Sequence, residues 1–157
     1  MFGNRSKVQS TDPETLVAMT QALFTAYSDH DIDQMISLCA PDMTLNYVPE
    51  GDNGKGDRET ARGFWSTFTS LIPDFRVDVY RIMVGERFTV AETIQGGTPA
   101  QDIGPIKAKG GTTMAPHCYV IQFSNDGLIS EITCYWDYNR IYAQLGHTEH
   151  HPELLES

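Results

Sequence analysis

Two titratable residues in the second half of the chain have the types and positions needed to move a proton. Asp137 follows an alternating run that ends at Trp136, so it stands at the end of the last expected strand. A carboxylate at the edge of an apolar pocket is poorly solvated, which raises its pKa and makes it a usable general acid or base. Asp is also common as a helix N-cap, and a short helix is expected from Tyr138. Both interpretations of Asp137 remain open from the sequence.

His117 is the second candidate for proton transfer. It lies in an expected strand over residues 115–123 and shares a face with Tyr119, Ile121 and Phe123. An imidazole could hydrogen-bond an enolate oxygen or relay a proton to Asp137. The alternative is a histidine that simply satisfies its hydrogen bonds within the core.

Other residues could bind a substrate beside these two. Glu92 lies between Val90 and Ile94 on an apolar strand face, so it is either a pocket acid or the counter-charge of an arginine. Asn46 and Tyr47 end the first expected strand, and only one of them can face a pocket because strand side chains alternate. The candidates for an aromatic pocket wall, with core packing as the alternative for those on helices, are Tyr27, Trp65, Phe68, Tyr119 and Tyr135.

Motifs for metal or cofactor chemistry are weak or missing. The segment HTEHH at 147–151 has metal-capable side chains but no third rigid element, so no metal site is expected there. There is no phosphate-binding or dinucleotide-binding glycine motif, and no cofactor is expected. The three cysteines, Cys39, Cys118 and Cys134, follow no metal or redox spacing. They are expected to be free thiols in a reducing cytoplasm.

The composition limits the partners of the protein. The chain has 157 residues, a formal net charge of −10 at pH 7 and 40% hydrophobic residues, which predicts one globular domain. The negative charge argues against binding to nucleic acids or to anionic membranes. No run of apolar residues is longer than four, so no membrane-spanning helix is expected.

The elements that must position these residues follow from hydrophobic periodicity. Helices are expected at about 13–28, 32–40 and 58–72, and a short closing helix at 138–145. Strands are expected at 43–48, 75–80, 88–94, 112–123 and 128–136, with a mobile surface loop at 49–57. Residues 96–109 are expected to form either a long connection or an irregular strand pair. This order predicts an α+β domain over 12–146, in which three helices cover one face of a curved antiparallel or mixed sheet and leave a pocket at the open end. Residues 1–11 and 147–157 are expected to be flexible.

The order of elements and three phrases carry a resemblance to a known family. The phrases are AYSDHDIDQMISLCAPDMTL (26–45), GFWSTFTSLIPDFRVDV (63–79) and DGLISEITCYWDYNRIYAQLG (126–146). They resemble the SnoaL-like polyketide cyclase and ester cyclase family of the nuclear transport factor 2-like superfamily. The resemblance implies a cone-shaped α+β barrel, an acid–base role for Asp137 and a homodimer formed through the outer sheet face.

Two classes of function follow from the residues and the resemblance together. The first is a cofactor-independent cyclase or isomerase for a hydrophobic, polyketide-like small molecule. Asp137 would remove and return a proton next to a carbonyl, and His117 or Asn46 would stabilise the oxyanion. The second is a small-molecule-binding or protein-interaction module without catalysis, because KGGTT at 109–113 departs from the Thr-Gly pair usual in ester cyclases. Epoxide hydrolysis is not expected, because residues 92–95 (ETIQ) lack the Arg-x-Asp pattern of that chemistry.

Overall fold

The chain folds in the order of elements that the sequence predicts. The structure is a computed structural model that describes residues 11–147; most of the two expected flexible ends, including the metal-capable residues 148–151, lies outside this range. The elements in chain order are α1 (Pro13–Ser28), α2 (Ile32–Ser37), β1 (Cys39–Tyr47), the 3-10 helix η1 (Val48–Gly54), β2 (Lys55–Gly56), α3 (Arg58–Leu71), β3 (Arg76–Gly85), β4 (Phe88–Gly97), β5 (Thr113–Phe123), β6 (Ile129–Trp136) and α4 (Tyr138–Gln144).

Aspartates begin the helices of the first half. The carboxylates of Asp12, Asp31 and Asp57 each accept a hydrogen bond from the backbone amide three residues further on, at 2.8, 3.1 and 3.0 Å. A carboxylate at this position satisfies a backbone donor and interacts favourably with the positive end of the helix dipole. Three of the acidic residues of the chain therefore begin helices.

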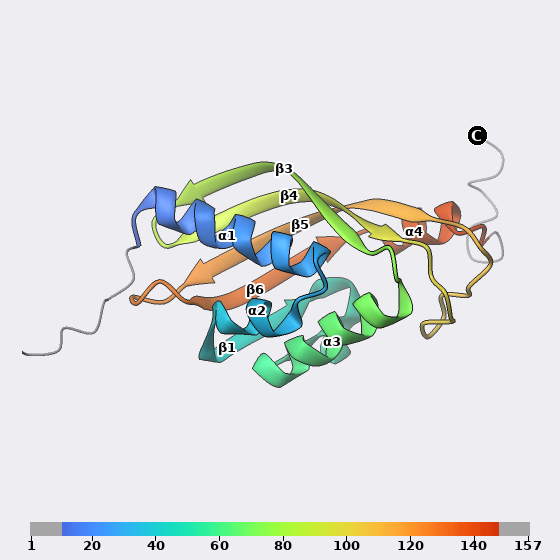
Figure 1. Cartoon of the computed structure of the whole chain (residues 1–157), viewed down its shortest axis with the longest axis horizontal. Coiled ribbons are helices and arrows are strands. Elements are labelled where there is room, and N and C mark those ends of the chain that lie inside the picture. The colour runs from blue at the N-terminus through green and yellow to red at the C-terminus, as the bar shows by residue number, and fades with distance from the viewer. Residues whose placement is uncertain (1–10, 148–157) are drawn as a thin grey trace, which may run out of the picture.

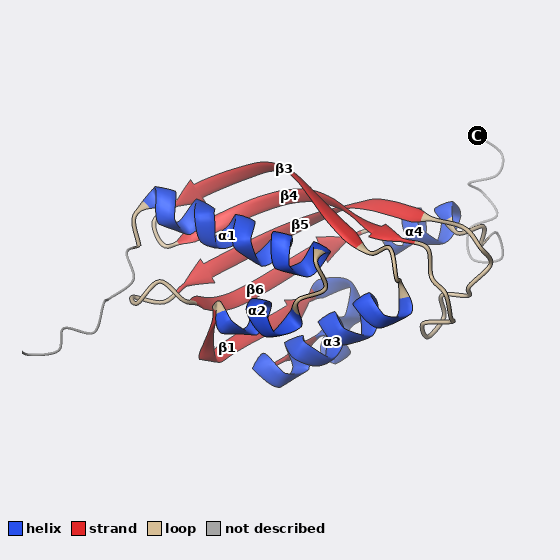
Figure 2. Ribbon diagram, in the orientation of Figure 1, coloured by secondary structure: helices blue, strands red, loops and turns tan. Residues whose placement is uncertain are grey.

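The six strands form one open, mixed sheet in the order β2-β1-β6-β5-β4-β3. Neighbours are antiparallel, except that β1 runs parallel to β6. The three helices α1, α2 and α3 lie on the same side of the sheet, whereas α4 lies near one end of it, beside the connection between β4 and β5 (Figures 1 and 2). The expected α+β architecture with a curved mixed sheet is confirmed.

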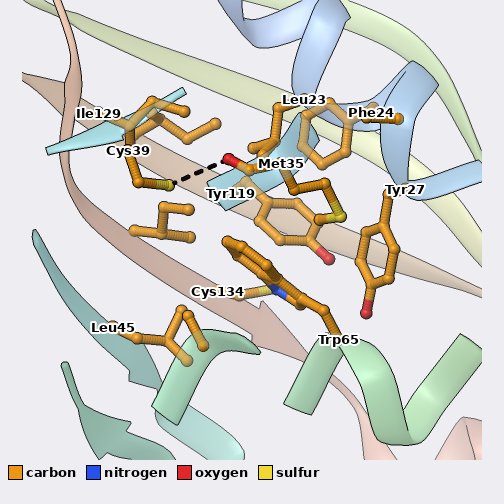
Figure 3. Close-up of a cluster of buried hydrophobic side chains, with 14 of the residues drawn as sticks. Leu23, Phe24, Tyr27, Met35, Cys39, Leu45, Trp65, Tyr119, Ile129 and Cys134 are labelled. Atoms are coloured by element: carbon orange, nitrogen blue, oxygen red, sulfur yellow. Dashed lines mark hydrogen bonds between the residues drawn. The ribbon is translucent and has the colours of Figure 1, made fainter. Parts of the chain in front are cut away.

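The hydrophobic core lies between the helices and the sheet. Tyr27 of α1 and Trp65 of α3 are each 1% exposed, and they face Tyr119 of β5 across the core (Figure 3). Cys39 and Cys134 are buried free thiols, in agreement with the expectation from their spacing. No helix within residues 11–147 is long and apolar enough to cross a membrane.

The structure corrects two local expectations. The second helix was expected to run to about residue 40, but α2 ends at Ser37, and Pro41 lies inside β1, which begins at Cys39. The pairing of β1 with β6 shifts register between Cys39 and Thr44, and a proline is tolerated at such an irregularity because no ladder hydrogen bond is lost. Instead of a loop, the segment 49–57 forms η1 and the short strand β2. A Cβ atom at Gly54 would lie 2.1 Å from the backbone oxygen of Tyr47, so glycine is required for η1 to fold back on β1.

Candidate functional site

An apolar cavity lies at the end of the sheet where α3, α4 and the connection 98–112 meet. Its volume is about 70 Å³. The strands contribute the polar side chains of its wall, and the helices and the connection contribute mainly apolar ones. The lining includes Tyr47, Phe68, Phe75, Gln95, Ile103, Ile106, Thr113, His117, Tyr119, Trp136, Tyr138, Ile141 and Leu145.

His117 is the basic side chain of this cavity. It lies on the inward face of β5 and is 9% exposed. Its Nδ1 atom is 2.9 Å from the carbonyl oxygen of Ala115; a carbonyl can only accept, so Nδ1 carries the proton. Burial lowers the pKa of His117 to about 4, although the bond to Ala115 acts in the opposite direction. The imidazole is therefore neutral at physiological pH and presents an unprotonated Nε2 in the cavity wall.

Aromatic rings hold the imidazole in place. Trp136 of β6 stacks on His117 with ring centroids 5.3 Å apart, and Tyr119 stacks at 6.5 Å. The opposite side of the site is formed by Tyr47 and Tyr138, whose rings meet Trp136 edge-on at 5.4 and 5.5 Å. Rings packed in this way restrict the rotation of the imidazole, so Nε2 keeps a defined direction.

Tyr47 supplies a hydrogen-bond donor. The indole nitrogen of Trp65 donates to Tyr47 Oη at 2.9 Å, and an indole N–H cannot accept. The oxygen of Tyr47 is thus the acceptor in this bond, and its own O–H, which also interacts with the Tyr27 hydroxyl, is not used by the bond to Trp65. Burial raises the pKa of Tyr47, so the hydroxyl stays protonated. The neighbouring Tyr27 hydroxyl is also buried and makes no hydrogen bond of ordinary geometry.

Gln95 supplies a second donor. Tyr119 Oη donates to Gln95 Oε1 at 2.6 Å, and both side chains are buried. Because this bond occupies the amide oxygen, the Nε2 group of Gln95 is left as a donor in the cavity wall. The cavity therefore combines one neutral base, two neutral donors and a largely apolar surface.

A carboxylate lies at the mouth of the cavity. Tyr138 Oη donates to Glu50 Oε1, which joins α4 to η1. Glu50 is half-buried, and burial raises its pKa above the ordinary value. No lysine, arginine or histidine among residues 11–147 forms an ion pair with it.

The connection 98–112 covers the cavity and is fixed at several points. Thr98 donates to Asp74 from its backbone N and from Oγ1, at 2.7 and 3.1 Å. The backbone N of Lys107 donates to Nε2 of His147 at 3.1 Å. His147 is 1% exposed, so this first residue of the expected flexible tail is packed against the connection rather than frayed.

The structure places Asp137 outside the cavity. Its side chain is exposed, and Oδ1 accepts a hydrogen bond from the backbone N of Asn139 at 2.9 Å. Asp137 is therefore the N-cap of α4, which is the alternative that the sequence left open. Its neighbour Trp136 is the strand residue that faces the cavity.

Three other expected site residues also lie away from the cavity. Glu92 is on the outer face of β4 and forms an ion pair with Arg81, so the counter-charge interpretation is correct and the pocket-acid interpretation is wrong. Tyr135 is 49% exposed on the same outer face. Asn46 points away from the core, whereas the adjacent Tyr47 points into it.

The other aromatic candidates divide between cavity and core. Phe68, Tyr47 and Tyr119 line the cavity as expected. Tyr27 and Trp65 are core residues behind it, and Trp65 reaches the site only through its bond to Tyr47.

Sequence reasoning missed Gln95, Glu50 and Tyr138. Gln95 alternates with Thr93 and Ala91 on the inward face of β4, and this alternation was the signal that could have identified it. Glu50 and Tyr138 meet across many residues of sequence, and no local pattern could have paired them. Within residues 11–147, no group of three or more His, Cys, Asp or Glu side chains is placed to hold a metal ion.

A family model described as a SnoaL-like domain matches residues 20–132. None of the curated proteins compared with the chain matches it significantly.

Many solved structures share the fold. TsrD from Streptomyces laurentii is 19% identical, with a TM-score of 0.75 over 87% of this chain and 98% of its own. IdmH, a proposed polyketide cyclase from Streptomyces antibioticus, is 22% identical, with a TM-score of 0.73 over 83% and 98%. SalBIII, an epoxide hydrolase/cyclase-like enzyme in pyran ring formation of the polyether salinomycin, is 12% identical, with a TM-score of 0.69 over 83% and 97%. At these identities the likeness shows the fold.

Proposed function

Because the chain belongs to the SnoaL-like domain family, we propose that it is a cofactor-independent cyclase or isomerase that moves a proton next to a carbonyl of an apolar small molecule. The observation that carries this proposal is the neutral, buried His117 in the wall of an apolar cavity. The hydrogen-bond donors Tyr47 and Gln95 line the same cavity. A base and two donors around one space are the groups that enolisation of a ketone requires.

The first step is removal of a proton from the carbon next to the carbonyl. Nε2 of His117 accepts this proton, and the electron pair of the C–H bond moves to the carbonyl oxygen. An imidazole with a pKa of about 4 is a weak base, so the step depends on lowering the pKa of the substrate C–H bond. Hydrogen bonds from Tyr47 Oη and Gln95 Nε2 to the developing oxyanion would do this in a site that excludes water.

The second step decides between ring closure and isomerisation. In ring closure the enolate carbon forms a bond to a second carbonyl carbon of the same molecule, and the new alkoxide takes the proton from the imidazolium of His117. In isomerisation the imidazolium returns the proton to a different carbon. Both routes leave His117 neutral and consume no oxidant, reductant or co-reactant.

Deuterium exchange tests the proposal without knowledge of the natural substrate. We expect the protein to speed the incorporation of deuterium next to the carbonyl of 2-tetralone, a two-ring ketone, in D₂O as followed by NMR. His117→Gln should lower the protein-dependent rate about 100-fold or more, because the amide cannot act as a base. Asp137→Asn is the matched control and should leave the rate unchanged. If Asp137 were the acid–base residue, this substitution would instead abolish the protein-dependent exchange.

A small-molecule-binding module without catalysis would give a different result in the same experiment. If 2-tetralone binds to the wild-type protein and exchanges no faster than in buffer, the cavity is a binding site and the enzymatic proposal is wrong.

We also propose that the homodimer implied by the resemblance forms through the outer face of the sheet. Exposed apolar side chains on this side support it, among them Tyr80, Phe88, Ile94 and Tyr135. Sedimentation velocity of the wild type and of Tyr135→Lys tests it: a dimer that the substitution dissociates is expected, and a wild-type monomer would contradict it.

A further inference from the structure

The cavity is too small to hold a carbon-rich substrate by itself. An engineered protein cavity of about 150 Å³ holds one benzene molecule, and this one measures about 70 Å³. A ligand with one or more rings must therefore extend through the mouth of the cavity. The shape and polarity of the surface just outside the mouth then determine which molecules fit.

A groove continues outwards from the mouth, between α3, η1 and the turn of the connection at 103–105. This mouth groove has a volume of about 420 Å³, and it shares Phe68 and Ile103 with the cavity, so the two spaces meet at these side chains. Phe64 extends its apolar wall, and Thr60 and Thr67 add hydroxyl groups. An elongated ligand can therefore pass from the cavity into the groove over a continuous apolar surface.

Among residues 11–147, Glu50 is the single charged residue in the lining of the mouth groove. The hydroxyl of Tyr138 donates to Oε1 and holds the carboxylate at the mouth. The second oxygen, Oε2, has no hydrogen bond with any of residues 11–147, and no cation pairs with it. A half-buried carboxylate without a cationic partner is costly unless a donor reaches it.

We propose that the mouth groove is a subsite for the distal part of the substrate, and that Glu50 selects molecules with a hydroxyl or ammonium donor on that part. The inference rests on the proposed function, because it concerns the substrate of the same cavity. The substrate class is then an elongated molecule with a carbonyl-bearing apolar portion near His117 and a donor group at its distal end. The raised pKa of Glu50 agrees with this role, because burial without a partner raises it and a bound donor would lower it again.

Gly63 offers a way to close the groove without disturbing the fold. It lies within α3 and lines the groove, and a Cβ atom added there meets no atom within 4 Å. The side chain added in Gly63→Leu should narrow the groove. Because leucine has a much better helix propensity than glycine, the variant should still fold.

Binding of four simple probes tests the proposal by calorimetry. Three have the same apolar length and differ at one end: 5-phenylpentylamine, 5-phenylpentan-1-ol and the methyl ether of that alcohol. The fourth, acetone, is a small ketone that is too short to reach the groove. We expect the amine to bind about tenfold more tightly than the ether, and the alcohol about threefold, because only they donate to Glu50.

Variants separate the role of Glu50 from general charge. Glu50→Gln should remove the preference for the amine over the ether and leave the affinity of the ether unchanged. Glu59→Gln removes an exposed charge of α3 that does not line the groove, and it should keep the preference. Gly63→Leu should weaken the three long probes at least fivefold and leave acetone unaffected.

Several outcomes would overturn the inference. The wild type could bind amine, alcohol and ether equally, or bind none of the long probes. Glu50→Gln could keep the full preference for the amine over the ether, or Glu59→Gln could lose that preference as fully as Glu50→Gln does. His117→Gln should keep the full probe preference while it loses deuterium exchange. Failure of the exchange assay alone therefore rejects the proposed function and leaves the subsite standing.

Discussion

Acidification should destabilise the protein through His117. Burial lowers the pKa of this imidazole to about 4 in the folded protein, whereas a histidine in an unfolded chain titrates at about 6.5. Between these two values the unfolded chain binds more protons than the folded one. The free energy of unfolding must therefore fall as the pH falls from about 6.5, and the loss is complete once the pH is below about 4.

The two pKa values also give the size of the effect. At pH 7.5 the imidazole is neutral in both states and contributes almost nothing. At pH 5 the imidazole of His117 is almost fully protonated in the unfolded chain and mostly neutral in the folded protein. This difference lowers the free energy of unfolding by about 2 kcal/mol. Below pH 4 the loss reaches its limit of about 3 kcal/mol.

Urea denaturation of the wild type and of His117→Gln at pH 7.5 and pH 5.0 measures this contribution. Other groups titrate alike in both proteins, so the difference between their pH-dependent losses isolates His117. The wild type should lose about 2 kcal/mol more than the variant between the two pH values. Equal losses within about 0.5 kcal/mol would show that His117 is not held neutral by burial, and the proposed base would lose its physical basis.

Three further predictions test the site and its surroundings. Asp137→Ala should lower the free energy of unfolding by about 1 kcal/mol in urea denaturation, because α4 loses its N-cap, and it should leave deuterium exchange unchanged. Trp65→Phe should cost about 1–3 kcal/mol, because a buried hydrogen bond is lost, and a double-mutant cycle with Tyr47→Phe should show a coupling of about 1 kcal/mol between the two side chains. Replacement of Glu92 by Gln should change the stability by less than about 1 kcal/mol, because its partner Arg81 is well exposed, and it should change neither exchange nor probe binding.

Local sequence signals predicted the elements well because they depend on nearby residues. The helix starting at Asp12 and the inward face of β5 around His117 follow from capping and alternation within a few positions. Alternation of strand side chains also puts Asp137 on the side opposite Trp136, which lines the cavity, and the Asp137 side chain caps α4.

The composition of the site depended on contacts that no local pattern encodes. Gln95 becomes a site residue through its hydrogen bond to Tyr119 on the neighbouring strand. Glu50 becomes one through its hydrogen bond to Tyr138 near the end of the domain. The short strand β2 escaped detection because two residues carry too little periodicity to identify a strand. Pairings between distant segments therefore limited what the sequence could predict about this cavity.

The parallel pairing of β1 with β6 has a consequence for synthesis on the ribosome. Asn46 lies opposite Thr133, so the strand that forms near the beginning of the chain has its main partner near the end. Until residues 129–136 have left the exit tunnel, β1 has an unpaired edge and Tyr47 lacks Trp136, its neighbour in the cavity wall. Such non-local pairing slows folding and exposes a strand edge that can aggregate. The ligand cavity is therefore a late product of folding, completed only when almost the whole domain has been made.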